Sequence, residues 1–86
     1  MIQRPTVLSP HEQRQRAVLD LLLDEHPAHL SLDEVRRATA ADPADPLALD
    51  DVDVAIRDLV AAGLIHRHDD FLFATRPAVH AWLLDP

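Results

Sequence analysis

The chain contains no cysteine, so its 86 residues can form neither disulfide bonds nor thiolate ligands for a metal. Glycine occurs once, and a single glycine cannot build the loop that cradles phosphates in nucleotide-binding enzymes. Tyrosine is also absent, and both serines stand where a helix is expected to begin. Because no nucleophile motif or phosphate loop is present, the sequence predicts a protein that is not an enzyme and uses no cofactor.

Lysine is missing as well, and eight arginines face 15 acidic residues, which gives a net charge of −7. Such a balance argues against indiscriminate nucleic-acid binding, because phosphates repel carboxylates. The acidity is local. Residues 42–58 hold six aspartates against one arginine, whereas the segments on either side each carry a net charge of only −1.

Long hydrophobic runs are lacking too, and the apolar stretches fall far below the ~20 residues that cross a bilayer. With no secretory signal either, the sequence predicts a cytoplasmic protein without a membrane partner. Its length leaves room for one domain. We expect a flexible N-terminal arm over residues 1–8 and a single domain over residues 9–86.

Helix signals divide the domain. Two S-x-x-E capping boxes, at residues 9–12 and 31–34, predict one helix that ends before His26-Pro27 and a short one through about Thr39. A third helix is expected from Asp45-Pro46 to the only glycine, Gly63. Its predicted core stripe comprises Leu49, Val52, Ile56, Leu59, Val60 and Gly63.

Strand signals are shorter. Residues 64–68 and 71–74 predict a hairpin that turns at Asp69-Asp70, and residues 28–30 are a candidate for a brief strand. Core packing is the expected use of Phe71 or Phe73. A last short helix is predicted to open at residues 75–77. The fold class is therefore α+β and mostly helical.

This order of elements resembles the winged helix-turn-helix superfamily. The resemblance rests mainly on residues 54–67, VAIRDLVAAGLIHR. They are similar to the recognition helix and wing of bacterial repressors of the multiple-antibiotic-resistance or ferric-uptake type. Residues 31–35, SLDEV, are similar to the start of the second helix in such domains. The resemblance spans residues 9–84 and implies a three-helix core, a small β-hairpin wing and a short C-terminal helix.

The resemblance also implies a regulator that binds double-stranded DNA. It would place four arginines near phosphates or the groove: Arg36, Arg37, Arg57 and Arg67. Their simpler interpretation is solvated helix surface, with Arg36 or Arg37 paired to Asp33. A homodimer closed by Trp82 and Leu83 of the last helix is expected as well.

The alternative is a protein-interaction adaptor. The N-terminal end of the third helix carries Asp50, Asp51 and Asp53, which would repel phosphates. With Val54 and Asp58 they form a surface that suits a basic partner protein. The acidic start and the proline-punctuated segment 42–46 both depart from the regulator pattern. A simpler interpretation is that aspartates stabilise the helix N-terminus.

Six histidines raise the question of a metal site. His66 and His68 lie two apart on one predicted strand, near His26 and His29, and Asp69 or Asp70 could complete a zinc or nickel site. No metal-binding motif accompanies them, so no metal site is predicted. Exposed histidines would instead add positive charge to the hairpin in mild acid.

Overall fold

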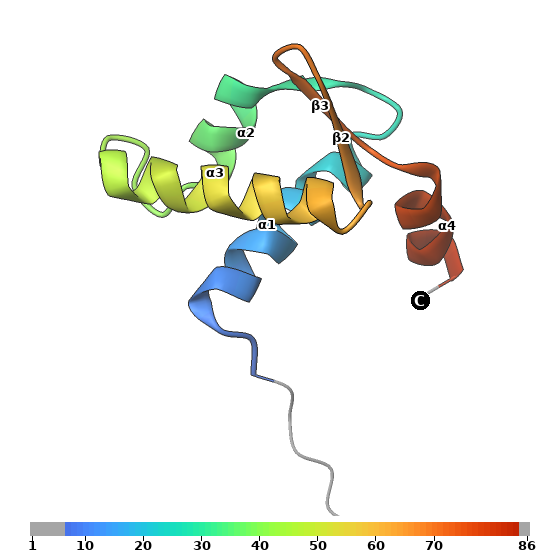
Figure 1. Cartoon of the computed structure of the whole chain (residues 1–86), viewed down its shortest axis with the longest axis horizontal. Coiled ribbons are helices and arrows are strands. Elements are labelled where there is room, and N and C mark those ends of the chain that lie inside the picture. The colour runs from blue at the N-terminus through green and yellow to red at the C-terminus, as the bar shows by residue number, and fades with distance from the viewer. Residues whose placement is uncertain (1–6, 85–86) are drawn as a thin grey trace, which may run out of the picture.

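Four helices and a three-stranded antiparallel sheet make up residues 7–84, the part of the chain that the computed structural model describes (Figure 1). This architecture confirms the α+β, mostly helical class. Of the arm predicted over residues 1–8, residues 1–6 lie outside the described part; Val7 is exposed, and the carbonyl of Leu8 accepts a hydrogen bond from Gln13. No helix within residues 7–84 combines the length and hydrophobicity needed to cross a membrane.

Both serine capping boxes form. Ser9 Oγ accepts from the backbone N–H of Glu12 at 3.1 Å, and the Glu12 carboxylate accepts from the N–H of Ser9 at 3.0 Å. Ser31 and Glu34 repeat this exchange. Each box satisfies two N–H groups that have no partner within the helix. The boxes begin α1 (Pro10–Asp24) and α2 (Leu32–Thr39), as predicted.

Helix α3 (Pro46–Ala61) also has the predicted ends. Asp45 Oδ1 accepts from the N–H of Leu47 at 3.0 Å, and Pro46 takes the first helical position, where a missing N–H costs nothing. After the helix, Gly63 adopts φ +76°, a left-handed conformation that favours glycine. The chain therefore reverses directly into the sheet.

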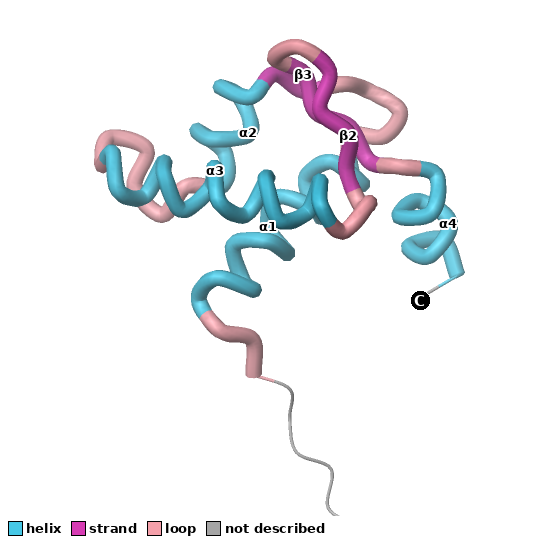
Figure 2. Tube along the Cα trace, in the orientation of Figure 1, coloured by secondary structure: helices cyan, strands magenta, loops and turns pink. Residues whose placement is uncertain are grey.

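The sheet has the strand order β1-β3-β2 (Figure 2). Strands β2 (Ile65–His68) and β3 (Phe71–Ala74) form the predicted hairpin, with Asp69 at φ +54° in the turn. Strand β1 (Leu30–Ser31), which lies between α1 and α2 in the chain, pairs with β3. The strand therefore overlaps only the last residue of the predicted 28–30 segment, since the residues that pair with Leu72 and Phe71 are Leu30 and Ser31.

The core lies between the inner face of the sheet and α1, α2 and α3. Its fully buried members are aliphatic: Val18, Leu22, Val35, Val52, Ile56, Ile65 and Leu72. Burying a leucine or isoleucine side chain of this kind contributes about 1.5–3 kcal/mol. The first three helices and the sheet thus form one hydrophobic unit.

Several predicted core assignments are wrong: Val60 and Gly63 are exposed, and neither Phe71 nor Phe73 lies in the core. Val60 is 39% exposed, because the buried stripe of α3 runs through Ala48, Val52 and Ala55 rather than through Val60. Phe71 is 49% exposed and Phe73 is half-buried. Side chains alternate along a strand, so Leu72 and Ala74 take the inner face of β3 and the two phenylalanines the outer face.

Helix α4 (Arg76–Leu84) lies at one end of the domain (Figure 1), where it packs against α1. Ala78 is its only buried residue. Trp82 is 43% exposed, and Leu83 and Leu84 are each 70% exposed. This helix therefore presents a large apolar surface to solvent.

Candidate functional site

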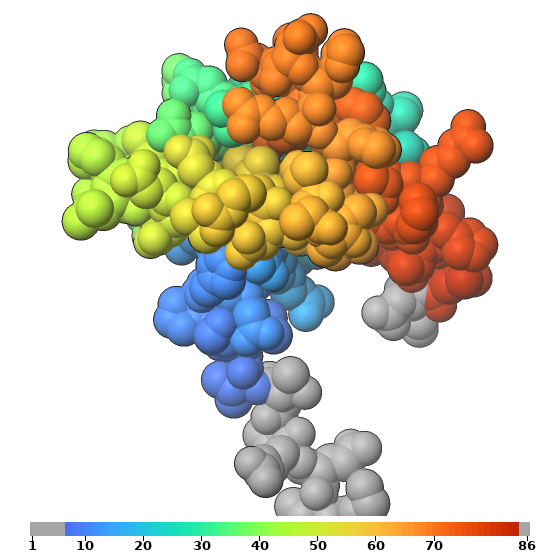
Figure 3. Space-filling model, viewed as in Figure 1, coloured from blue at the N-terminus to red at the C-terminus, as the bar shows by residue number. Residues whose placement is uncertain are grey.

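Helix α3 is exposed along its length on one face of the molecule, where its surface lies beside that of the hairpin (Figure 3). Its outermost strip consists of Asp50, Val54, Arg57 and Ala61, all of which are exposed. The strip carries one carboxylate and one guanidinium. The predicted acidic surface is therefore less acidic at its centre than the sequence alone indicates.

The first reason is an ion pair between α2 and α3. Arg36 Nε lies 3.1 Å from Asp53 Oδ1, and both atoms are shielded from solvent. The N–H is not aligned as a hydrogen bond, so the attraction between them is electrostatic. Arg36 was predicted to contact DNA and Asp53 to bind a basic partner. The structure instead joins the two residues to each other.

The second reason for the weaker acidity of the outer strip is that two aspartates of α3 lie beside α1. Asp58 Oδ2 lies 2.9 Å from His11 Nε2, and Asp51 borders a hollow of ≈ 290 Å³ with Pro10, His11 and Arg14. All five residues of the predicted partner-binding set lie on α3, but they face different neighbours. Asp51 and Asp58 face α1, Asp53 faces α2, and Asp50 and Val54 lie on the outer strip.

His11 stabilises the ionised form of Asp58. The hydrogen bond with His11 is the main reason that the pKa of Asp58 is lowered from its ordinary value; Arg57 acts in the same direction and partial desolvation opposes both. Sequence reasoning missed His11, because His11 and Asp58 lie far apart in the chain. No local signal pairs them.

The remaining predicted arginines are exposed. Arg37 pairs with Asp33 at 2.5 Å, one turn away on α2, as the simpler interpretation anticipated. Arg57 lies 3.5 Å from Asp58. Exposed pairs of this kind contribute only about 0–1 kcal/mol, so both guanidinium groups are available to a stronger anion at little cost. Arg67, on β2, has no carboxylate partner among residues 7–84.

Two of the histidines near the hairpin contact the side chain of a phenylalanine. His29 stacks on Phe73 with centroids 4.2 Å apart, and His66 tilts against the same ring at 5.2 Å. His26 and His68 are exposed. Within residues 7–84, no three His, Asp or Glu side chains come together as a metal-binding group.

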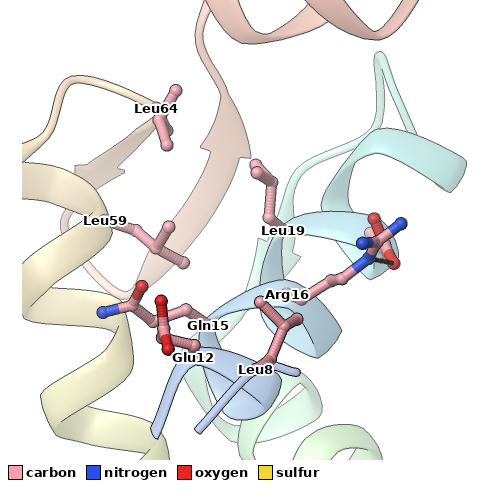
Figure 4. A pocket seen from close by; sticks show the side chains of 8 residues that line it. Leu8, Glu12, Gln15, Arg16, Leu19, Leu59 and Leu64 are labelled. Carbon is pink, nitrogen blue, oxygen red and sulfur yellow. Dashed lines mark ion pairs between the residues drawn. The ribbon is translucent and has the colours of Figure 1, made fainter. Parts of the chain in front are cut away.

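A shallow groove lies between α1, the C-terminal end of α3 and α4. Its main hollow, of ≈ 370 Å³, has Leu8 and Leu19 on one side and Leu59 and Leu64 on the other (Figure 4). A second hollow shares Leu19 and Leu64 and reaches Trp82. The Arg16–Asp20 ion pair, at 3.5 Å, borders both hollows. The groove thus connects the start of α1 with the exposed apolar side chains of α4.

These surfaces provide cations for phosphates, a weakly charged strip on α3 and an apolar groove beside α4. All three are surface features suited to binding. A comparison of the chain with known protein families, curated proteins and solved structures found no match.

Proposed function

We propose that the protein is a non-enzymatic winged-helix regulatory module that binds double-stranded DNA. The observation that carries this proposal is the topology of the sheet. Strand β1, which precedes α2, pairs with the second strand of the hairpin that follows α3, giving the order β1-β3-β2. This connection supports a three-helix core with the hairpin as its wing, the arrangement that the resemblance implies.

In this arrangement the outer strip of α3 enters the major groove and the hairpin lies along the sugar-phosphate backbone. Arg57 and Arg37 leave their weak surface pairs for phosphates, and Arg67 contacts phosphate from the wing. The strip offers no amide side chain for reading bases. Phosphate contacts therefore supply most of the affinity, and binding depends strongly on salt.

A homodimer would double these contacts. Trp82 and Leu83 are exposed on a helix that buries only Ala78, and they continue the apolar groove. Packing α4 of two copies together would cover this surface and place two wings on neighbouring half-sites. The dimer is part of the proposed function.

The test is a fluorescence-anisotropy titration of a labelled random-sequence duplex at about 50 mM and 200 mM salt. We expect binding at low salt and at least about tenfold weaker binding at high salt. The double variant Arg57→Ala/Arg67→Ala should bind weakly at both. Arg16→Ala is the matched control, because this exposed arginine of α1 lies at the groove, away from the outer strip of α3. Absence of duplex binding by micromolar protein at low salt would overturn the proposal.

The second candidate is the protein adaptor. It is favoured by the observation that Asp50 and Asp51 have no cationic partner among residues 7–84. The variant Asp50→Asn/Asp51→Asn separates the candidates. Tighter duplex binding supports the DNA module, whereas weaker binding of an arginine-rich model peptide with no effect on duplex supports the adaptor.

A further inference from the structure

The outer face of the sheet carries an unusual collection of rings. Strand alternation places Ile65, Leu72 and Ala74 in the core and turns their neighbours outward. We define the ring face as the five ring side chains on the outer side of the sheet: His29, His66, His68, Phe71 and Phe73. The whole chain has only two phenylalanines and one tryptophan, and both phenylalanines lie on this face.

The rings are arranged in two groups. Phe73 is half-buried and is contacted by His29 at 4.2 Å, with 14° between the ring planes, and by its cross-strand partner His66 at 5.2 Å. Phe71 lies opposite His68 in the ladder and is 49% exposed. The rings of the first group are packed against one another, whereas the ring of Phe71 has surface free for a ligand.

The charge of the ring face differs from that of the protein as a whole. Its outward side chains on β1, β2 and β3 include no carboxylate, although the chain has a net charge of −7. The turn that follows β2 does carry an acid: the carboxylate of Asp69 is 3.7 Å from His68 Nε2. Three imidazoles supply N–H donors. Arg67, between His66 and His68 on β2, pairs with Leu72 and therefore does not belong to this face. The face therefore complements an anion that also presents flat apolar groups.

We propose that the ring face binds single-stranded nucleic acid, with a base stacked on Phe71 and adjacent phosphates contacted by His68 and His66. Unpaired bases expose the flat surfaces that such stacking needs, whereas a duplex hides them. This binding site is separate from the α3 strip and extends beyond the proposed duplex binding. Because stacking is indifferent to base identity, the site prefers single strands over duplex and has little sequence preference.

The test uses the full chain and a fluorescein-labelled oligothymidylate of about 12 nucleotides at about 50 mM salt. We expect saturable binding by anisotropy. Phe71→Ala should weaken it by at least about fivefold, the lower end of the loss when one stacked base is removed, and Phe71→Trp should restore it. Leu47→Ala is the matched control, because it removes another exposed hydrophobic side chain, 73% exposed on α3, without touching the sheet. Unchanged affinity in Phe71→Ala, or no binding by the parent protein, would overturn the inference.

The duplex titration keeps this inference apart from the proposed function. Phe71→Ala should leave duplex binding unchanged, and Arg57→Ala should weaken duplex binding but not oligothymidylate binding. If the duplex is not bound but oligothymidylate binding depends on Phe71, the ring face is a nucleic-acid site and the duplex proposal is wrong. Equal loss of both ligands in Phe71→Ala would show one shared site and overturn the separate ring-face site.

Discussion

Arg36 Nε and Asp53 Oδ1 face each other at 3.1 Å and are both shielded from solvent, which joins α2 to α3. The pair neutralises one of the three aspartates near the start of α3. It also holds in place the two helices whose relative position would determine how α3 reaches a partner.

Replacing Asp53 with Asn should lower the free energy of unfolding by about 1 kcal/mol, because the shielded Arg36 loses its counter-charge. Asp50→Asn is the matched control on the same helix, and should change stability by less than about 0.5 kcal/mol because Asp50 is exposed. Urea denaturation measures both. A double-mutant cycle with Arg36→Ala gives the coupling between the two side chains, and additive effects would show that the pair does not contribute.

The pairing of His11 with Asp58 predicts a dependence of stability on pH. Because the pKa of Asp58 is lowered in the folded state, its contribution to stability is fully present above the ordinary aspartate pKa and is lost as the pH falls through the lowered value. His11→Ala should therefore lower the thermal midpoint near neutral pH, and the difference from the parent protein should shrink in acid. Thermal unfolding across a pH series measures this. A difference that persists at the acid end would contradict the linkage.

Gly63→Ala should destabilise the protein by about 1 kcal/mol. A Cβ at Gly63 would meet nothing within 4 Å, so the cost comes from holding alanine at φ +76° rather than from a clash. Gly63→Asn is the control, because asparagine tolerates the left-handed conformation better and should cost less. Chemical denaturation of the two variants decides between strain and crowding, since crowding would make the larger asparagine worse.

The two valines of α3 should behave differently when truncated. Val52 is fully buried, and Val52→Ala should cost roughly 1–3 kcal/mol through lost burial and the cavity left behind. Val60 is 39% exposed, and Val60→Ala should change stability by less than about 0.5 kcal/mol. Similar losses would return Val60 to the core, where helical periodicity had placed it.

The dimer is tested on α4. Trp82→Ala/Leu83→Ala should shift the protein toward monomer, because these side chains supply exposed apolar surface next to the groove. Leu47→Ala is the control, since Leu47 is 73% exposed at the opposite end of α3. Light scattering coupled to size-exclusion chromatography reports the mass. A parent protein that is monomeric at high micromolar concentration would remove dimerisation from the proposal.

Most element ends were predictable from short stretches of chain. Ser9 with Glu12, Ser31 with Glu34, and Asp45 with Pro46 act over three residues or fewer, so their capping geometry follows from local order alone. Gly63 ends its helix for an equally local reason. These local signals predict where the helices begin and end, whatever the packing between the helices.

The composition of the candidate site was less predictable, because it depends on residues distant in the chain. Arg36 and Asp53 were assigned to opposite partners, and nothing near either residue indicates that they meet. Phe71 or Phe73 was expected in the core because the chain has few large side chains, yet the alternation of β3 gives the inner positions to Leu72 and Ala74.

Local hydrogen-bonding rules therefore account for where the helices and strands lie, since each capping group and its N–H partner are neighbours in the chain. Packing decided which charges are neutralised and which rings face solvent. The reason is physical: electrostatic pairing and burial depend on distance in space, and helices α1, α2 and α3 acquire their mutual distances only when the common core of Leu22, Val35 and Ile56 forms.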